Sequence, residues 1–232
     1  MINRQLPVNM EEAWLIFILT LIGSAFIALI VRDRIIDWLK NKFSGVYSLF
    51  KGRYLLKEME ILGIKKIYKT RTEVENKNPF FRLDMSIELS HYKALGISLA
   101  RIKNLGDEPI WHQLRKGCKF EFVLLNPDSP FMNQRSSQEN PTLKGETEGF
   151  IEWIKKFSTV EHKTQIEVWI YDLMPTMAIT IINDNSLFVN PYSLLRRNQE
   201  FPVIEIGDGS LFSLYTEEYQ KVRGHLKTKQ IL

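Results

Sequence analysis

The sequence predicts an α/β fold: a sheet with helices on both faces, preceded by one transmembrane helix and an amphipathic helix. Three observations predict it. Residues 13–31 form an uncharged apolar run, residues 32–54 repeat apolar side chains every three to four positions, and short apolar strands alternate with helices from about residue 55. The 232 residues are 44% hydrophobic and 25% charged, which suits one compact domain with an appendage and excludes a disordered chain.

The first expected element is a transmembrane helix over residues 13–31, because an uncharged run of this length spans the hydrocarbon at about 1.5 Å per residue. A cleaved signal peptide is the competing interpretation, but Glu11 and Glu12 precede the run and no small-residue cleavage site follows it. Lys and Arg are concentrated after the run, with Arg4 alone before it. The positive-inside rule therefore predicts an external N-terminus (residues 1–12) and a cytoplasmic remainder.

One face of this helix would carry small and weakly polar side chains. Thr20, Ser24 and Ala28 recur at every fourth position, and Gly23 lies beside them. Such a face allows close helix packing. Two interpretations stay open: simple helix association, or several copies arranged around a narrow pore with Thr20 and Ser24 facing inward.

Residues 32–54 are expected to form an amphipathic juxtamembrane helix, either a self-associating stalk or a helix lying on anionic headgroups. Its apolar positions are Ile35, Leu39, Phe43, Val46 and Phe50. Residues 32–77 hold twelve Lys/Arg and six Asp/Glu, whereas residues 78–232 hold eighteen and nineteen. The basic excess is therefore concentrated in one stretch.

Residues 55–232 are expected to be one cytoplasmic domain, in which apolar β-branched runs mark strands and 3.6-residue periodicity marks helices. Strands are expected at 64–68, 95–100, 119–125, 165–171, 178–183, 186–189 and 202–206. Helices are expected at 53–62, 79–93, 107–116, 142–158 and 210–227. Residues 126–140 are expected to form a long polar loop.

Common catalytic and metal-binding motifs are absent from the sequence. Four scattered histidines and the single Cys118 provide no zinc spacing and no disulfide, so no metal and no cofactor is expected. A lone cysteine also suits a reducing compartment. The sequence contains no phosphate-cradling G-x-x-x-x-G-K-[ST], no G-x-S-x-G and no H-E-x-x-H. His162 beside Glu161 is interpreted as a surface pair.

Four segments together resemble the phospholipase D-like family, and more narrowly a divergent bacterial branch that often serves as a sensory or effector domain. They are ILGIKKIYKTR (61–71), ALGISLARI (94–102), LRKGCKFEFVLLNPDSP (114–130) and VWIYDLMPTMAITIINDNSLFVNPY (168–192). The resemblance implies that the α/β fold is a phospholipase D-like mixed sheet. It also implies pairing of copies, hence a homo-oligomer, a dimer or a tetramer.

Active members of that family use H-x-K-x-x-x-x-D, in which the His attacks phosphorus and the Lys binds phosphate oxygen. The resemblance places this motif at Met177, Ile179 and Asp184, so only the aspartate is kept. A thioether and a butyl group cannot perform these steps, and the domain is expected not to be an enzyme. A second candidate, His225 and Lys227, has Leu232 at the aspartate position.

A degenerate phosphodiesterase domain of this kind is expected to keep a groove that binds a nucleic-acid or nucleotide signal. The candidate ligand-binding residues are Lys65, Lys66, Tyr68, Lys69, Arg71, Asp184, Tyr192, Arg196 and Arg197. Arg71 is the preferred phosphate contact because it ends the family pattern G-I-x-x-I-Y-x-x-R. Anionic lipid is the alternative partner for the basic side chains.

The function expected from these observations is that of a membrane effector in the bacterial inner membrane. An oligonucleotide such as single-stranded DNA, or a nucleotide made by a partner nucleotidyltransferase, would control oligomeric transmembrane helices. By analogy, these helices would form a pore in anti-phage defence. Two alternatives stay open: a membrane-tethered phosphodiesterase or nuclease, and a non-catalytic scaffold that recruits a partner protein.

Overall fold

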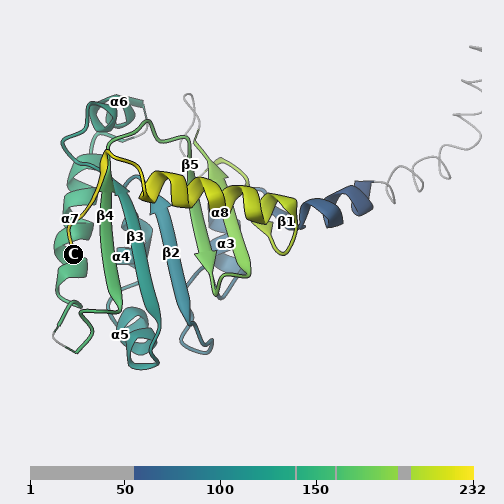
Figure 1. Cartoon of the computed structure of the whole chain (residues 1–232), viewed down its shortest axis with the longest axis horizontal. Coiled ribbons are helices and arrows are strands. Elements are labelled where there is room, and N and C mark those ends of the chain that lie inside the picture. Colours follow the sequence, from purple (N-terminus) through teal and green to yellow (C-terminus); the bar gives the residue numbers. More distant parts are fainter. Residues whose placement is uncertain (1–54, 139, 160, 193–199) are drawn as a thin grey trace, which may run out of the picture. The chain divides into compact units, whose positions relative to one another are not determined.

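The computed structural model describes residues 55–138, 140–159, 161–192 and 200–232. The chain divides into two units, residues 1–57 and residues 58–232. The second unit is an α/β domain built on one eight-stranded sheet, with strand order β1-β7-β6-β5-β2-β3-β4-β8 (Figure 1). Strands β2, β3 and β4 pair in parallel and all the other neighbours pair antiparallel, so the sheet is mixed.

The strands are β1 (Ile64–Tyr68), β2 (His91–Gly96), β3 (Lys119–Leu125), β4 (Ile166–Tyr171), β5 (Met177–Ile182), β6 (Ser186–Pro191), β7 (Val203–Ile206) and β8 (Thr228–Gln230). The helices are α3 (Arg71–Lys77), α4 (Ala100–Asn104), α5 (Glu108–Arg115), α6 (Pro130–Gln138), α7 (Leu143–Lys155) and α8 (Ser210–Arg223), and a further helical segment covers residues 55–62.

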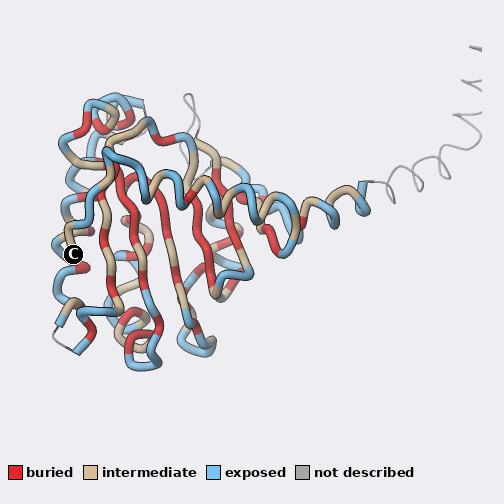
Figure 2. Tube along the Cα trace, viewed as in Figure 1, coloured by how far each residue is buried: buried red, intermediate tan, exposed pale blue. Residues whose placement is uncertain are grey.

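Two hydrophobic clusters lie on opposite faces of the sheet. On one face, α3, α4, α5 and α7 pack onto the strands, for example through Phe150 of α7, whose ring centroid lies 5.3 Å from that of Phe122. On the other face, α8 crosses the sheet and buries Tyr219, whose hydroxyl donates to Glu121 Oε1 at 2.8 Å (Figure 1). Burial is concentrated in the central strands, while the outer sides of the helices are exposed (Figure 2). The apolar surface removed from water on both faces is the main stabilising contribution.

Two expected elements around β2 were wrong. Residues 79–93 were expected to be helical, but turns run from 79 to 86 and β2 begins at His91. Side chains take the place of the helical backbone acceptors: Asn78 Oδ1 accepts from the Phe81 N–H at 3.1 Å, and Asp84 Oδ1 accepts from the Ser86 N–H at 2.9 Å. The strand expected at 95–100 is displaced as a result, because β2 ends at Gly96.

Four short elements were not expected, namely α3, α4, α6 within the supposed loop, and β8. The strands expected at 64–68 and 119–125 are confirmed as β1 and β3. The other expected strands, from β4 to β7, agree to within two residues.

The expected fold class, a phospholipase D-like sheet behind a transmembrane helix and an amphipathic helix, is corrected. The part of the chain that the structure describes is an α/β domain with an eight-stranded mixed sheet and seven helical segments. The eighth strand arises because the chain turns back after α8 and pairs with β4. Among the described residues, none belongs to a helix long and apolar enough to cross a bilayer.

The membrane-related predictions fall on residues that lie outside the described part of the chain. They concern the transmembrane segment at 13–31 with Thr20, Gly23, Ser24 and Ala28, and the amphipathic segment at 32–54. They stay predictions.

Candidate functional site

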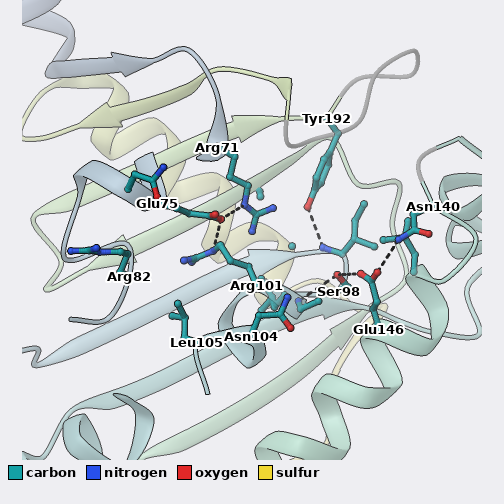
Figure 3. A pocket seen from close by; sticks show the side chains of 17 residues that line it. Arg71, Glu75, Arg82, Ser98, Arg101, Asn104, Leu105, Asn140, Glu146 and Tyr192 are labelled. Atoms are coloured by element: carbon teal, nitrogen blue, oxygen red, sulfur yellow. Dashed lines mark hydrogen bonds and ion pairs between the residues drawn. The ribbon is translucent and has the colours of Figure 1, made fainter. Parts of the chain in front are cut away.

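A pocket of about 540 Å³ opens at the carboxyl end of β2 (Figure 3). At this strand the sheet changes direction, because β2 pairs in parallel with β3 on one side and antiparallel with β5 on the other. Ligands in open α/β sheets commonly bind beyond the carboxyl ends of the parallel strands. The lining residues come from α3, the segment 96–100, α4, the start of α7, β5 and the end of β6.

Two arginines in the pocket share one carboxylate. Arg71 begins α3, and its Nε lies 3.4 Å from Glu75 Oε1, one helical turn later. Arg101 lies on α4, and its Nε is 3.7 Å from the same oxygen. Burial, and then the charge of Arg101, lower the pKa of Arg71. Two guanidinium groups face one carboxylate here, so this part of the pocket has an excess of positive charge.

Arg101 is also held in place by contacts that do not involve Glu75. Its Nη1 donates to the Phe81 carbonyl at 2.5 Å, its Nη2 donates to the Tyr92 hydroxyl at 3.0 Å, and its guanidinium lies 3.9 Å from the centroid of the Phe81 ring. Arg82 adds a third cation to the lining and pairs with Asp84 at 3.3 Å. Arg101 is therefore positioned by contacts within the domain.

The backbone between β2 and α4 approaches the pocket closely. Leu99 adopts a left-handed conformation, φ = 50°, at the start of α4. A Cβ atom at Gly96 would lie 2.8 Å from Leu99 Cδ2, so only glycine fits there without a shift. Tyr192 closes this side, because its hydroxyl accepts from the Ile97 N–H at 3.1 Å. Burial raises the pKa of Tyr192, which keeps the phenol neutral.

The wall formed by the start of α7 carries a carboxylate. Glu146 Oε2 accepts from Ser98 Oγ at 3.1 Å, and its Oε1 accepts from Asn140 Nδ2 at 2.8 Å and Thr142 Oγ1 at 2.9 Å. Because Glu146 lies in the first turn of α7, the helix dipole also favours its negative charge. Figure 3 shows Glu146 and Asn140 on the side of the pocket away from Arg82 and Glu75.

The structure brings two of the predicted ligand-binding residues, Arg71 and Tyr192, to this pocket. Lys65, Lys66 and Lys69 are exposed on or just after β1 and are not part of the lining. Arg196 and Arg197 lie outside the described residues.

Tyr68 is buried rather than free to stack on a ligand. Its hydroxyl donates to Glu205 Oε2 at 2.7 Å, and Lys66 Nζ lies 4.6 Å from the centroid of its ring. Burial is the main cause that raises the pKa of Tyr68 to about 12. Tyr68 therefore contributes to the domain core.

The three residues aligned with the degenerate catalytic motif do not meet in space. Met177 begins β5, and Ile179 is buried on the face of the sheet that α8 covers. Asp184 lies in the turn at the opposite end of β5, where its Oδ1 pairs with Lys93 Nζ at 2.7 Å. The β5 residue that lines the pocket is Ala178.

Sequence reasoning missed the other charged residues of the pocket: Glu75, Arg82, Arg101 and Glu146. One signal was present in the sequence. Thr70 and Glu73 form a T-x-x-E pattern, and in the structure Thr70 Oγ1 accepts from the Glu73 N–H at 3.2 Å. This pattern predicts a helix starting at residue 71, which would have placed Arg71 and Glu75 on one face.

The described residues contain no cluster of three or more His, Cys, Asp or Glu side chains that could hold a metal ion. No protein-family profile and no curated protein matches the sequence. A solved structure with a similar trace is that of TrmBL2, "an archaeal chromatin protein" described as showing "a novel mode of DNA binding". It is 14% identical, the match covers 88% of this chain and 71% of that chain, and the TM-score is 0.43. A likeness at this level supports no assignment of fold or ligand.

Proposed function

We propose that the pocket at the end of β2 binds a phosphate-bearing ligand. The observation that carries this proposal is the pair of guanidinium groups, Arg71 and Arg101, that share the single carboxylate of Glu75. A planar guanidinium matches the geometry of phosphate oxygens and forms short, charge-assisted hydrogen bonds with them. A phosphate bound to Arg71 and Arg101 would balance the positive charge that one carboxylate leaves uncompensated.

Binding rather than phosphoryl transfer is the activity that the lining favours. The lining residues within the described part of the chain include no histidine, lysine or cysteine. Ser98 Oγ donates to Glu146 at 3.1 Å, and a serine nucleophile would additionally need an oxyanion site. We therefore propose a ligand-binding domain without hydrolytic activity.

The test is a titration of the full chain with inorganic phosphate, followed by ³¹P NMR line broadening or calorimetry. Arg71→Gln removes one charged donor, worth about 1.5–3 kcal/mol, so we expect affinity to fall about 10- to 150-fold. Lys65→Gln is the matched control, because Lys65 is an exposed cation on β1 that does not line the pocket. Saturable binding that both variants weaken equally, or neither, would refute the site.

The wider expectation also stays a proposal. It comprises the relation of the sequence segments to the phospholipase D-like family, a homo-oligomeric effector in the bacterial inner membrane, and control by an oligonucleotide or nucleotide signal. A ligand-binding pocket in the domain that follows residues 1–57 is compatible with such a sensor. The membrane and pore steps depend on residues outside the described part.

A further inference from the structure

The two ends of the pocket carry opposite charge. Arg71, Arg82 and Arg101 supply three cations from α3, the following turn and α4, with Glu75 between two of them. The start of α7 supplies Glu146, a carboxylate (Figure 3). A second phosphate at that end would meet like charge in a partly buried site, which is unfavourable. The pocket therefore suits a ligand with one anionic end.

The acidic end retains capacity to accept a hydrogen bond. An ionised carboxylate has about four acceptor positions on its two oxygens. Glu146 uses three of them: two on Oε1, from Asn140 and Thr142, and one on Oε2, from Ser98. One position on Oε2 is left for a donor such as a sugar hydroxyl or an exocyclic amine.

The groups around Glu146 are polar and held in place. Asn140 Oδ1 accepts from the Thr142 N–H at 3.1 Å while its amide nitrogen donates to Glu146, so the loop before α7 fixes the carboxylate. Asn104 adds an amide to the lining at the end of α4. The pocket volume of about 540 Å³ lies within the range of roughly 300–1,000 Å³ found for small-molecule sites.

We infer that the pocket selects a nucleotide carrying a single phosphate, with the phosphate at Arg71 and Arg101 and a sugar or base donor at Glu146. This inference rests on the proposed function, since it assigns the second end of the same site. Two sources supply this chemistry: a free nucleoside 5′-monophosphate, and the 5′-phosphorylated terminal nucleotide of an oligonucleotide. Polyphosphates and internal stretches of phosphate backbone fit poorly, because they bring further negative charge to Glu146.

The experiment compares inorganic phosphate, pyrophosphate and AMP on the full chain, by competition against one reporter ligand. We expect AMP to bind at least tenfold more tightly than either phosphate compound. Glu146→Ala should remove that advantage without weakening the binding of inorganic phosphate. Glu146→Gln, which keeps the shape and removes the charge, should raise the affinity for pyrophosphate.

Glu148→Ala is the matched control, because Glu148 lies on the same helix, pairs with Lys144 at 3.9 Å and does not line the pocket. Unfolding curves for the variants show whether Glu146→Ala only disturbs α7; Glu146→Gln then provides the decisive comparison. AMP binding that equals phosphate binding, or an AMP advantage that survives in both Glu146 variants, overturns the inference and leaves the phosphate site intact. Phosphate binding that Arg71→Gln weakens no more than Lys65→Gln does overturns both the inference and the proposed function.

A second arm separates the two sources. A four-nucleotide DNA is added with and without a 5′-phosphate. Tighter binding of the phosphorylated DNA than of AMP identifies an oligonucleotide end as the ligand, and weaker binding identifies the free nucleotide. Equal binding of the phosphorylated and unphosphorylated DNA, with an affinity at least that of AMP, overturns the inference.

Discussion

Glu75 is the residue whose replacement tests the arginine site most directly. Its Oε1 lies 3.4 Å from Arg71 Nε and 3.7 Å from Arg101 Nε, so an incoming phosphate has to compete with this carboxylate for both guanidinium groups. Glu75→Gln removes the negative charge and keeps the size of the side chain. We predict that the variant binds phosphate more tightly than the original chain.

The size of the effect follows from the exposure of the pairs. The Glu75 side chain is 32% exposed, and those of Arg71 and Arg101 are 20% and 11% exposed. Ion pairs with this degree of solvent contact are worth about 0.5–1 kcal/mol each. A ligand that no longer has to displace two of them gains about 1–2 kcal/mol, which is roughly a 5- to 30-fold decrease in Kd.

Calorimetry with inorganic phosphate measures this change at low salt, and repetition at higher salt should reduce it because screening weakens charge interactions. Glu73→Gln is the control on the same helix, because Glu73 pairs with Lys77 at 2.7 Å and does not line the pocket. Weaker binding by Glu75→Gln would show that the carboxylate positions the arginines or contacts the ligand, and would refute the competition argument.

Three further predictions concern stability, pH and the N-terminal segment. Gln113→Ala should lower the free energy of unfolding by about 2–3 kcal/mol in urea titrations, because this buried amide accepts from the Leu89 N–H at 3.3 Å and donates to the Ile87 carbonyl at 2.9 Å. Burial raises the pKa of the Cys118 thiol to about 12, so the stability that this buried neutral thiol contributes is fully present below pH 9 and is lost as the pH rises toward 12. A thiol reagent at pH 8 should therefore label Cys118 only after the domain unfolds. The uncharged run at 13–31 predicts that the full chain resists carbonate extraction from membranes, and recovery in the carbonate supernatant would contradict the anchor.

Strands with a continuous apolar run were predictable from the sequence. KFEFVLL at 119–125 is β3, and its residues from Phe122 to Leu125 are buried because parallel neighbours and helices cover both faces. Helices that bury little were not predictable in this way. In α3 only Val74 is buried, so its helical signal lies in the Thr70 cap and in charge pairs rather than in apolar periodicity.

The helix predicted over residues 79–93 was wrong for a different reason. PFFRLDMSIEL has helix-like apolar spacing, yet Asn78, Asp84 and Gln113 bond its backbone groups and hold it in turns. These partners depend on the tertiary fold, since Gln113 comes from α5, 24 residues beyond Leu89. The same error explains why Arg101 was not predicted as a site residue. A strand expected to extend to residue 100 leaves no room for α4, the helix that places Arg101 in the pocket.

The two arginines of the site are held in unequal ways, and this decides how the pocket can respond to a ligand. Arg101 is fixed by the Phe81 carbonyl, the Tyr92 hydroxyl and the Phe81 ring, none of which a phosphate would displace. Arg71 lies on the seven-residue α3, which buries one side chain, and in the pocket it pairs with Glu75. Arg101 therefore supplies the preorganised part of the affinity. If the pocket rearranges when a ligand binds, we expect α3 to be the element that moves, because few buried contacts oppose its movement.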